Sequence, residues 1–283
     1  MTTVEVFAPA KINLTLHVTG QRDDGYHLLD SLVTFATVGD VIRVTPAEAI
    51  RLTLTGPEAQ HVPTGVDNLV VRAAHLFGDA FDIVLEKNLP VAAGVGGGSA
   101  DAAAVLKAIS KAMNSPLPSP AEQLALGADV PVCVMGGLVR MRGIGEVLEP
   151  IDRAPVGWPM VLVNPRVPAS TPAVFEALPR KDNTPMADPY ELGPVPHHRD
   201  EFIDWLARQR NDLETPAKAL VPVIGEVLAA LNGQTGCCLA RMSGSGATCF
   251  GLFADDDDAR AAAHALTKAY PEWWVVPSTG SGF

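Results

Sequence analysis

The stretch PVAAGVGGGSADAAAVL, Pro90 to Leu106, decides the fold, because a cluster of glycines runs without a break into a segment with helical spacing. Ser99 stands where an N-cap residue is expected for that helix. Glycines let backbone N–H groups converge on an anion, and the positive end of a following helix favours negative charge. The stretch therefore predicts a phosphate-binding loop, with a tight corner between a strand and a helix as the alternative.

The sequence excludes two better-known nucleotide-binding loops. The dinucleotide fingerprint needs a third glycine where this chain has Ser99, and the Gly-Lys-Ser/Thr of a Walker loop occurs nowhere. The segment FDIVLE before the glycines predicts a strand that runs into the loop. Phosphate binding is thus predicted from the glycines and the helix start alone.

Composition limits the class of protein. The chain has 283 residues, 47% of them hydrophobic and 19% charged, which is typical of one large or two ordinary globular domains. Its formal net charge of −11 argues against nucleic-acid binding, which depends on Lys and Arg at phosphates. The chain opens without a signal-like segment, and its longest apolar run is interrupted. We expect a soluble, cytoplasmic protein with neither a membrane nor a nucleic-acid partner.

Polar residues near the start and middle of the chain could carry chemistry. Lys11 and Asn13 share one face of a predicted strand, where they could hold a substrate oxygen and a carboxylate, or form an ordinary solvated face. Asp129 lies among apolar residues, and a buried carboxylate is costly unless it is paired or used. Lys11 is a candidate partner for Asp129, and backbone N–H groups are the alternative.

Three further groups have weaker signals. Tyr26 and His27 follow a turn and could stack on a planar ring and bond to it, or form a surface corner. Asp101 is interpreted as an acid in the first helical turn, stabilised by the helix dipole. The second glycine turn, Ser243 to Gly246, could donate N–H groups to phosphates or connect two strands.

Potential metal ligands lack partners at ligand spacing. His197 and His198 stand without an acid or cysteine nearby and are interpreted as solvated loop residues. The cysteines have no CxxC pattern and are interpreted as buried, reduced thiols: Cys133, Cys237, Cys238 and Cys249. The sequence therefore assigns no metal ligand.

The predicted elements favour an α+β fold. Strands gather early in the chain and mix with helices later, rather than alternating regularly. Ser119 to Glu122 forms a capping box for a short helix that ends before Gly127. We further predict a strand after the bend at Gly127, a strand after a Gly39-Asp40 turn, and one helix over about 215–231. The irregular Pro179 to Arg199 segment is the best candidate for a lobe boundary, although WPMVLVNP can already belong to the second lobe.

Together these pieces resemble the GHMP kinase superfamily of small-molecule kinases. The resemblance extends in order over nearly the whole chain and is carried by PAKINLTLHVTGQRDDGYHLLDSL, GVGGGSADAA, GADVPVCVMGG with RGIGE, VPASTPAVF, RNDLE and SGSGATCF. It implies a two-lobed fold with an N-terminal lobe over 1–157, a ferredoxin-like C-terminal lobe over 158–283, and the active site in the cleft between them. It implies transfer of the γ-phosphoryl of ATP, with Mg²⁺, to a methylerythritol 2-hydroxyl of a small molecule bearing cytidine diphosphate, on the non-mevalonate isoprenoid route.

The resemblance also implies roles for single residues. The catalytic pair would be Lys11 and Asp129, with Asn13 beside the reacting hydroxyl. The cytidine-bearing substrate would be held by Tyr26, His27, Thr171 and Phe175. ATP would lie at Asn68, on the adenine side, and at the loop formed by Pro90, Val91, Ala92, Ala93, Gly94, Val95, Gly96, Gly97, Gly98, Ser99 and Ala100.

One departure and two alternatives remain open. Family members commonly carry a second serine at the position of Ala100, so a hydroxyl ligand from that side chain is absent here. Another GHMP kinase acting on homoserine or mevalonate is disfavoured by Tyr26 and His27, because those substrates have no aromatic base. A nucleotide-binding protein without catalysis is disfavoured by Lys11 and Asp129, since a pure binder needs neither.

Overall fold

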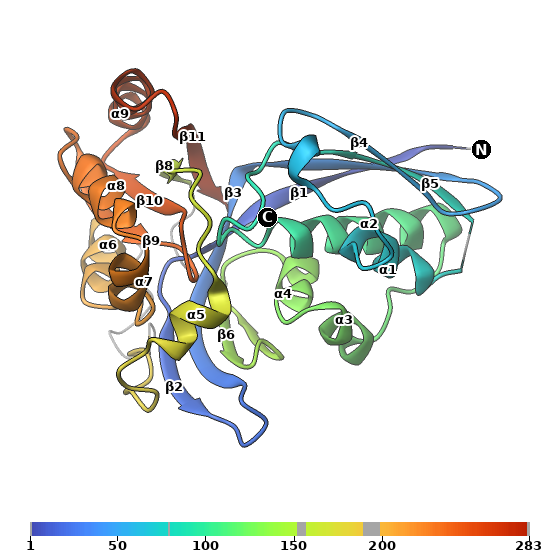
Figure 1. Ribbon diagram of the computed structural model, residues 1–283, viewed down its shortest axis with the longest axis horizontal. Coiled ribbons are helices and arrows are strands. Elements are labelled where there is room, and N and C mark those ends of the chain that lie inside the picture. The colour runs from blue at the N-terminus through green and yellow to red at the C-terminus, as the bar shows by residue number, and fades with distance from the viewer. Residues whose placement is uncertain (1, 79, 152–156, 189–198, 282–283) are drawn as a thin grey trace. The chain divides into compact units, whose positions relative to one another are not determined.

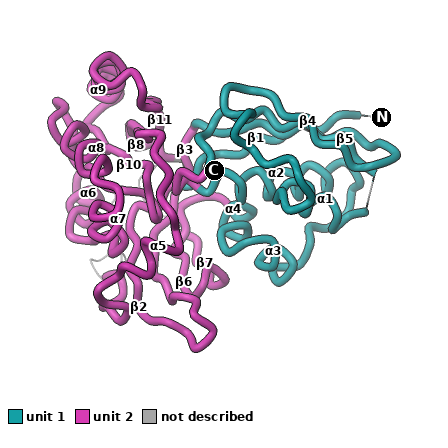
Figure 2. The backbone as a smooth tube through the Cα atoms, in the orientation of Figure 1, with its two compact units in different colours: residues 1–11, 38–91, 96–135 teal, residues 12–37, 92–95, 136–283 magenta. Residues whose placement is uncertain are grey.

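The computed structural model describes residues 2–78, 80–151, 157–188 and 199–281 (Figure 1). Its internal contacts divide the chain into two compact units, drawn in two colours in Figure 2. Unit 1 consists of Met1–Lys11, Val38–Val91 and Gly96–Met135. Unit 2 consists of Ile12–Thr37, Ala92–Val95 and Gly136–Phe283.

Unit 1 packs helices against a small sheet. Strand β5 (Phe81–Glu86) runs parallel to β4 (Arg51–Thr55) and antiparallel to the second half of β3 (His27–Pro46), which also pairs with β1 (Val4–Asn13). The alternation in FDIVLE gives β5 one buried face. In Figure 1 the four α-helices lie together on one side of these strands. The helices of this unit are η1 (Ala59–His61), α1 (Leu69–His75), α2 (Gly97–Met113), α3 (Pro120–Leu126) and α4 (Val130–Met135).

Unit 2 contains an antiparallel sheet with a β-α-β-β-α-β core. Strand order is β11-β8-β10-β9, and α8 and α9 connect the first and second pairs of these strands in the chain. This order and connectivity are those of a ferredoxin-like arrangement, as predicted for the C-terminal lobe. The bounds are β8 Trp158–Asn164, α8 Val223–Asn232, β9 Cys237–Met242, β10 Cys249–Phe253, α9 Asp256–Ala269 and β11 Trp274–Ser281.

Further elements complete unit 2. Strands β2 and β6 pair with the first half of β3, and β7 pairs with β6. Near its end β11 pairs with β3 through Gly280 and Ala36. The remaining bounds are β2 His17–Gln21, β6 Val139–Gly143, β7 Val147–Pro150, α5 Thr171–Glu176, α6 Arg199–Ala207 and α7 Glu214–Leu220.

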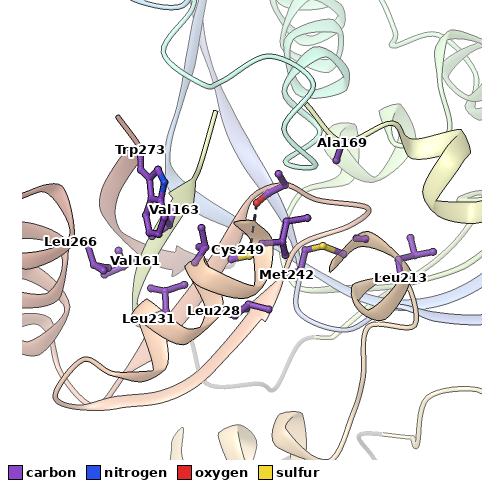
Figure 3. Packing of buried hydrophobic residues seen from close by; sticks show 14 of the residues in the cluster. Val161, Val163, Ala169, Leu213, Leu228, Leu231, Met242, Cys249, Leu266 and Trp273 are labelled. Atoms are coloured by element: carbon purple, nitrogen blue, oxygen red, sulfur yellow. Dashed lines mark hydrogen bonds between the residues drawn. The ribbon is translucent and has the colours of Figure 1, made fainter. Parts of the chain in front are cut away.

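The core of unit 2 lies between its sheet and α8 and α9. Figure 3 shows Val161 and Val163 of β8 near Leu231 of α8 and Leu266 of α9. All four side chains are almost completely buried. Burial of one such side chain contributes about 1.5–3 kcal/mol, so this cluster holds the framework on which the loops of unit 2 are mounted.

Three predicted elements are wrong in detail. Residues 130–135 form helix α4 rather than a strand, because Pro131 occupies an early helical position where its missing N–H costs nothing. The helix predicted over 215–231 is two helices, since Pro222 separates α7 from α8. Gly39 and Asp40 do not form a turn but lie within the continuous strand β3.

The division by packing differs from the predicted lobes 1–157 and 158–283. Strands β1 and β3 each contribute residues to both units, so the units are discontinuous along the sequence. Units defined by packing do not test these lobe boundaries, which stay a prediction. His197 and His198 and the middle of the predicted Pro179 to Arg199 connection lie outside the described residues. Within the described ranges, every helix is too short or too polar to cross a bilayer.

Candidate active site

Lys11 and Asp129 form an ion pair in unit 1. Lys11 Nζ lies 2.8 Å from Asp129 Oδ2, and the lysine side chain is only 5% exposed. Asp129 precedes α4, has the partner that the sequence suggested, and keeps 32% of its side chain exposed, so it is less buried than its apolar neighbours indicated. A carboxylate that is oriented by a buried ammonium and open to solvent can accept a proton from a bound molecule.

The polar strand face that contains Lys11 is buried. Lys11, Asn13, Thr15 and His17 are at most 4% exposed, so the alternative of a solvated face is wrong. Buried polar groups are costly without hydrogen-bond partners. We therefore expect each of these buried side chains to have hydrogen-bond partners within the protein or in a bound ligand.

The start of α2 presents free backbone donors. Gly96 is the N-cap, with φ 61°, and a Cβ there would lie 3.1 Å from Lys11 Cε. The first helical bond of this segment joins Ala100 N to Gly96 O. The preceding N–H groups, of Gly97, Gly98 and Ser99, have no acceptor within the helix and suit an anion. The prediction of Ser99 as the N-cap is wrong by three positions, because only glycine tolerates this left-handed cap so close to Lys11.

A buried ionic cluster lies behind the glycines in unit 1. Lys87 Nζ donates to Asp101 Oδ2 at 2.8 Å and to Asp40 Oδ2 at 2.5 Å. Asp40 Oδ1 also accepts the N–H groups of Asn88 and Leu89, which lead into the glycine stretch. The cluster thereby ties β3 and the chain after β5 to α2.

Asp101 is therefore not a helix-dipole residue. It lies beyond the first turn of α2 and is 2% exposed. Burial raises the pKa of its carboxyl to about 8, against the opposing charge of Lys87. The pKa of Lys87 is raised because its two aspartates outweigh the effect of burial.

Residues Ala92–Val95 of the glycine stretch belong to unit 2 and pack on the second glycine turn. A Cβ on Gly94, whose φ is 73°, would lie 2.6 Å from Gly246 O. Ser243 Oγ donates to Gly94 O at 3.2 Å, and Thr248 N donates to Ala93 O at 3.1 Å. The two predicted glycine turns therefore support each other directly within this unit.

Asn13 is bonded on both its backbone and its side chain. Its N–H donates to Ser243 Oγ at 3.1 Å, and its Nδ2 donates to Ser31 Oγ at 2.8 Å. Its Oδ1 is buried and has no hydrogen-bond partner within the described part of the chain. A single unused acceptor on a residue predicted to bind substrate is available to a ligand donor.

Tyr26, His27 and Phe175 offer aromatic surfaces in unit 2. His27 and Phe175 are stacked with ring centroids 4.6 Å apart, and Tyr26 is 58% exposed. Burial, and then the charge of Lys181, lower the pKa of His27, which keeps the ring neutral at pH 7. A neutral imidazole donates from one nitrogen and accepts at the other, as the edge of a base requires.

The last two predicted binding residues are placed by helix starts. Thr171 begins α5, and its Oγ1 lies 2.7 Å from Ser245 Oγ of the second glycine turn. Asn68 caps α1 by accepting from Val70 N, and its Nδ2 donates to Pro63 O. Asn68 thus has a clear structural role, and its place on the adenine side stays a prediction.

The structure separates the predicted residues into local groups. Lys11, Asp129 and Gly96 meet in unit 1, while Asn13 and Gly94 share Ser243 in unit 2. Ala100 is buried at 2% exposure, so Ser99 is the hydroxyl that remains at the helix start.

Sequence reasoning missed Ser31, Asp40 and Lys87. The available signal for Asp40 was its place in an apolar segment, and the signal for Lys87 was its place just before the glycine stretch. The four cysteines are free thiols, as interpreted from the sequence, and Cys133 and Cys249 are buried. The expected burial is wrong for Cys238, which is exposed, and for Cys237, which is half-buried.

Comparison with known proteins agrees with this geometry. The model described as GHMP kinases N terminal domain matches residues 68–137, and that described as GHMP kinases C terminal matches 197–272. A 4-diphosphocytidyl-2-C-methyl-D-erythritol kinase of Cereibacter sphaeroides is 58% identical over 98% of this chain and 99% of its own. One of Paramagnetospirillum magneticum is 51% identical, with 98% and 99% covered.

Solved structures give the same result. A crystal structure of 4-(cytidine 5'-diphospho)-2C-methyl-D-erythritol kinase matches with a TM-score of 0.78 and 36% identity, covering 98% of this chain and 100% of that one. A homoserine kinase from Cytophaga hutchinsonii has a TM-score of 0.72 at 19% identity, with 100% and 96% covered, and shares the fold. The chain therefore belongs to the GHMP kinases and, within them, to the 4-diphosphocytidyl-2-C-methyl-D-erythritol kinases.

Proposed function

We propose that this protein transfers the γ-phosphoryl group of ATP to the 2-hydroxyl of 4-diphosphocytidyl-2-C-methyl-D-erythritol, a step of the non-mevalonate route to isoprenoid precursors. The observation that carries the proposal is the ion pair between buried Lys11 and half-exposed Asp129, with Gly96 against the lysine stem. Membership in the family supplies the substrates, and this pair supplies the chemistry that they need.

Phosphoryl transfer depends mainly on positioning and on neutralising charge. The substrate hydroxyl oxygen forms a bond to the γ-phosphorus, and the bond from that phosphorus to the bridging oxygen of ADP breaks. Asp129 accepts the hydroxyl proton, while Lys11 orients the carboxylate and offsets charge on the phosphoryl oxygens. The N–H groups of Gly97, Gly98 and Ser99 bind the phosphates of ATP. The loop from Pro90 to Ala100, with Asn68 on the adenine side, forms the proposed ATP site.

Magnesium belongs to the proposal because ATP-dependent transfer commonly uses it. Within the described residues, no group of three or more His, Cys, Asp or Glu side chains could form a metal cage. Mg²⁺ usually keeps several waters and takes only one or two protein ligands besides substrate phosphates. The Ser99 hydroxyl, in the first turn of α2 beside the proposed phosphate site, fits such a partial ligand set. When bound, the ion would neutralise charge on the phosphates.

The substrate side is proposed for Asn13, Tyr26, His27, Thr171 and Phe175. An exposed tyrosine beside a neutral imidazole suits an aromatic base, which homoserine and mevalonate lack. A cytoplasmic location and the lobes 1–157 and 158–283 are parts of the same proposal. A binder without catalysis would have no use for a buried lysine paired to an open carboxylate.

Asp129→Asn tests the catalytic base. We expect kcat to fall by about 10²–10⁴-fold, because the amide cannot take the proton, with KM for ATP nearly unchanged. A coupled ADP-release assay measures both constants with the cytidine-bearing alcohol, homoserine and mevalonate as acceptors.

The matched control is Asp82→Asn, which neutralises a half-exposed aspartate of β5 in the same unit. It should keep wild-type turnover. Near wild-type kcat in Asp129→Asn would remove the base assignment, and turnover of homoserine or mevalonate alone would replace the proposed substrate.

A further inference from the structure

The amide of Asn13 is held in one orientation by a buried serine. Ser31 is 0% exposed, and its Oγ donates its single hydrogen to Thr15 O at 2.5 Å. The same oxygen lies 2.8 Å from the side-chain amide of Asn13. Because its hydrogen is already used, Ser31 can only accept from Asn13. The NH₂ group of Asn13 must therefore face Ser31, and the carbonyl oxygen must face the other way.

Thr15, whose carbonyl oxygen accepts the hydrogen bond of Ser31, is itself held in place by hydrogen bonds. Thr15 Oγ1 accepts Leu32 N at 2.9 Å and donates to Met186 Sδ at 3.0 Å. Thr15 and Met186 are both buried. The carbonyl of Thr15 therefore has little freedom to release the hydrogen of Ser31.

The backbone of Asn13 is fixed by the same principle. Ser243 is 0% exposed, donates to Gly94 O and accepts from Asn13 N. One buried serine thus holds the main chain of Asn13, and another holds its side chain. The residue enters the site with both its position and its amide orientation determined.

The side-chain carbonyl oxygen of Asn13 is the one acceptor of this residue's amide that these contacts leave unused. Asn13 Oδ1 is buried without a partner in the described chain and lies 3.4 Å from the position of a Cβ on Gly244. A buried carbonyl oxygen without a hydrogen bond is costly, so it is retained where a ligand supplies the donor. A hydroxyl is such a donor, whereas an ether or a phosphate oxygen is not.

We propose that Ser31 is a positioning residue for substrate selection: it turns Asn13 so that its carbonyl oxygen accepts a hydrogen bond from the hydroxyl to be phosphorylated, in the complex of the protein with the alcohol alone. The hydroxyl has one hydrogen, which it donates to Asn13 in this binary complex and passes to Asp129 only during transfer. Ser31 touches Asn13 and not the substrate. This inference rests on the proposed function, because it takes the acceptor alcohol from there.

The test compares binding of the alcohol with binding of its 2-deoxy analogue, measured by calorimetry. The wild-type protein should prefer the alcohol by about tenfold, the value of one hydrogen bond in a buried site. Ser31→Ala should reduce this preference to about twofold or less, because the amide can then turn. Ser31→Thr keeps the hydroxyl and should restore the preference.

The matched control is Ser278→Ala, which removes a buried serine bonded to Thr37 elsewhere in unit 2. It should keep the wild-type preference. If Ser31→Ala does not fold, Ser31→Cys gives the same comparison with a weakly bonding thiol.

The outcomes separate the two proposals. A wild-type protein that does not bind the alcohol overturns the function and the inference together. A wild-type protein that binds both ligands equally, or a Ser31→Ala variant that keeps full preference, overturns the inference and leaves the function standing.

Discussion

At the residue scale, Tyr26 should act on the substrate and not on the fold. Tyr26 is 58% exposed, and the hydrogen bonds found for it are those of its backbone, whose N–H donates to Asp24 Oδ1 and whose carbonyl oxygen accepts from Arg22 N. Tyr26→Ala should raise KM for the cytidine-bearing alcohol by about tenfold, because stacking on a base is worth about 1–3 kcal/mol. Steady-state kinetics would measure KM for the alcohol and for ATP, and only the first should change.

Phe7→Ala is the matched control for Tyr26, since Phe7 is an exposed aromatic at 42% exposure on β1. It should leave KM for the alcohol unchanged. An unaltered KM in Tyr26→Ala would show that the base is held without this ring.

Single residues were predicted well where one chemical argument sufficed. A carboxylate among apolar residues needs a partner, and Lys11 was the candidate that the structure pairs with Asp129. The burial of the polar strand face was not predictable, because alternation along a strand does not say what covers each face. Asp101 was misread for a related reason: its partners, Asp40 and Lys87, are distant in sequence.

At the element scale, the turn at Gly94 should tolerate no side chain. A Cβ there would lie 2.6 Å from Gly246 O and 2.8 Å from Ser243 O, and both are backbone atoms. The left-handed φ adds about 1–2 kcal/mol for any other residue. Gly94→Ala should therefore lower the free energy of unfolding by at least this amount, measured by urea denaturation, and weaken ATP binding.

Gly98→Ala is the control in the same stretch. Gly98 is helical, and a Cβ would meet Leu69 at an ordinary 3.6 Å. Alanine favours a helix over glycine by about 1 kcal/mol, so stability should stay equal or rise. Equal stability of Gly94→Ala and wild type would contradict the packing of the two glycine turns.

Elements followed from the sequence where capping and period agreed. The capping box at Ser119 and the alternation in FDIVLE gave α3 and β5 as they stand. The segment VPVCVM misled because β-branched residues favour strands, whereas this short helix is buried against α2, and packing overrides propensity.

At the scale of the whole molecule, the buried cluster at Asp101 should make stability depend on pH. Burial raises the pKa of Asp101 from 3.8 to about 8, so between these values the folded protein binds more protons than the unfolded chain. The free energy of unfolding should then fall as pH rises through this window. Asp101→Asn should flatten the fall by at most about 1.4 kcal/mol per pH unit, measured by denaturation from pH 5 to 8.

Asp257→Asn is the control for this experiment. Asp257 is 92% exposed and paired with Arg260 on α9. Its neutralisation should leave the slope of stability against pH unchanged. Identical slopes in wild type and Asp101→Asn would mean that the carboxyl is ionised throughout the window.

The passage of the chain between the two units limits how this enzyme can be recombined. The chain changes unit after Lys11, Thr37, Val91, Val95 and Met135, and two of these changes fall inside the glycine stretch. A gene chimaera with a single crossover would therefore combine segments of two parents within at least one unit. Exchange of an intact unit with a relative requires five junctions, and two of them flank only Ala92–Val95. In a library of shuffled genes, active members should therefore be found chiefly among those that exchange a whole unit, with a crossover at each of the five junctions.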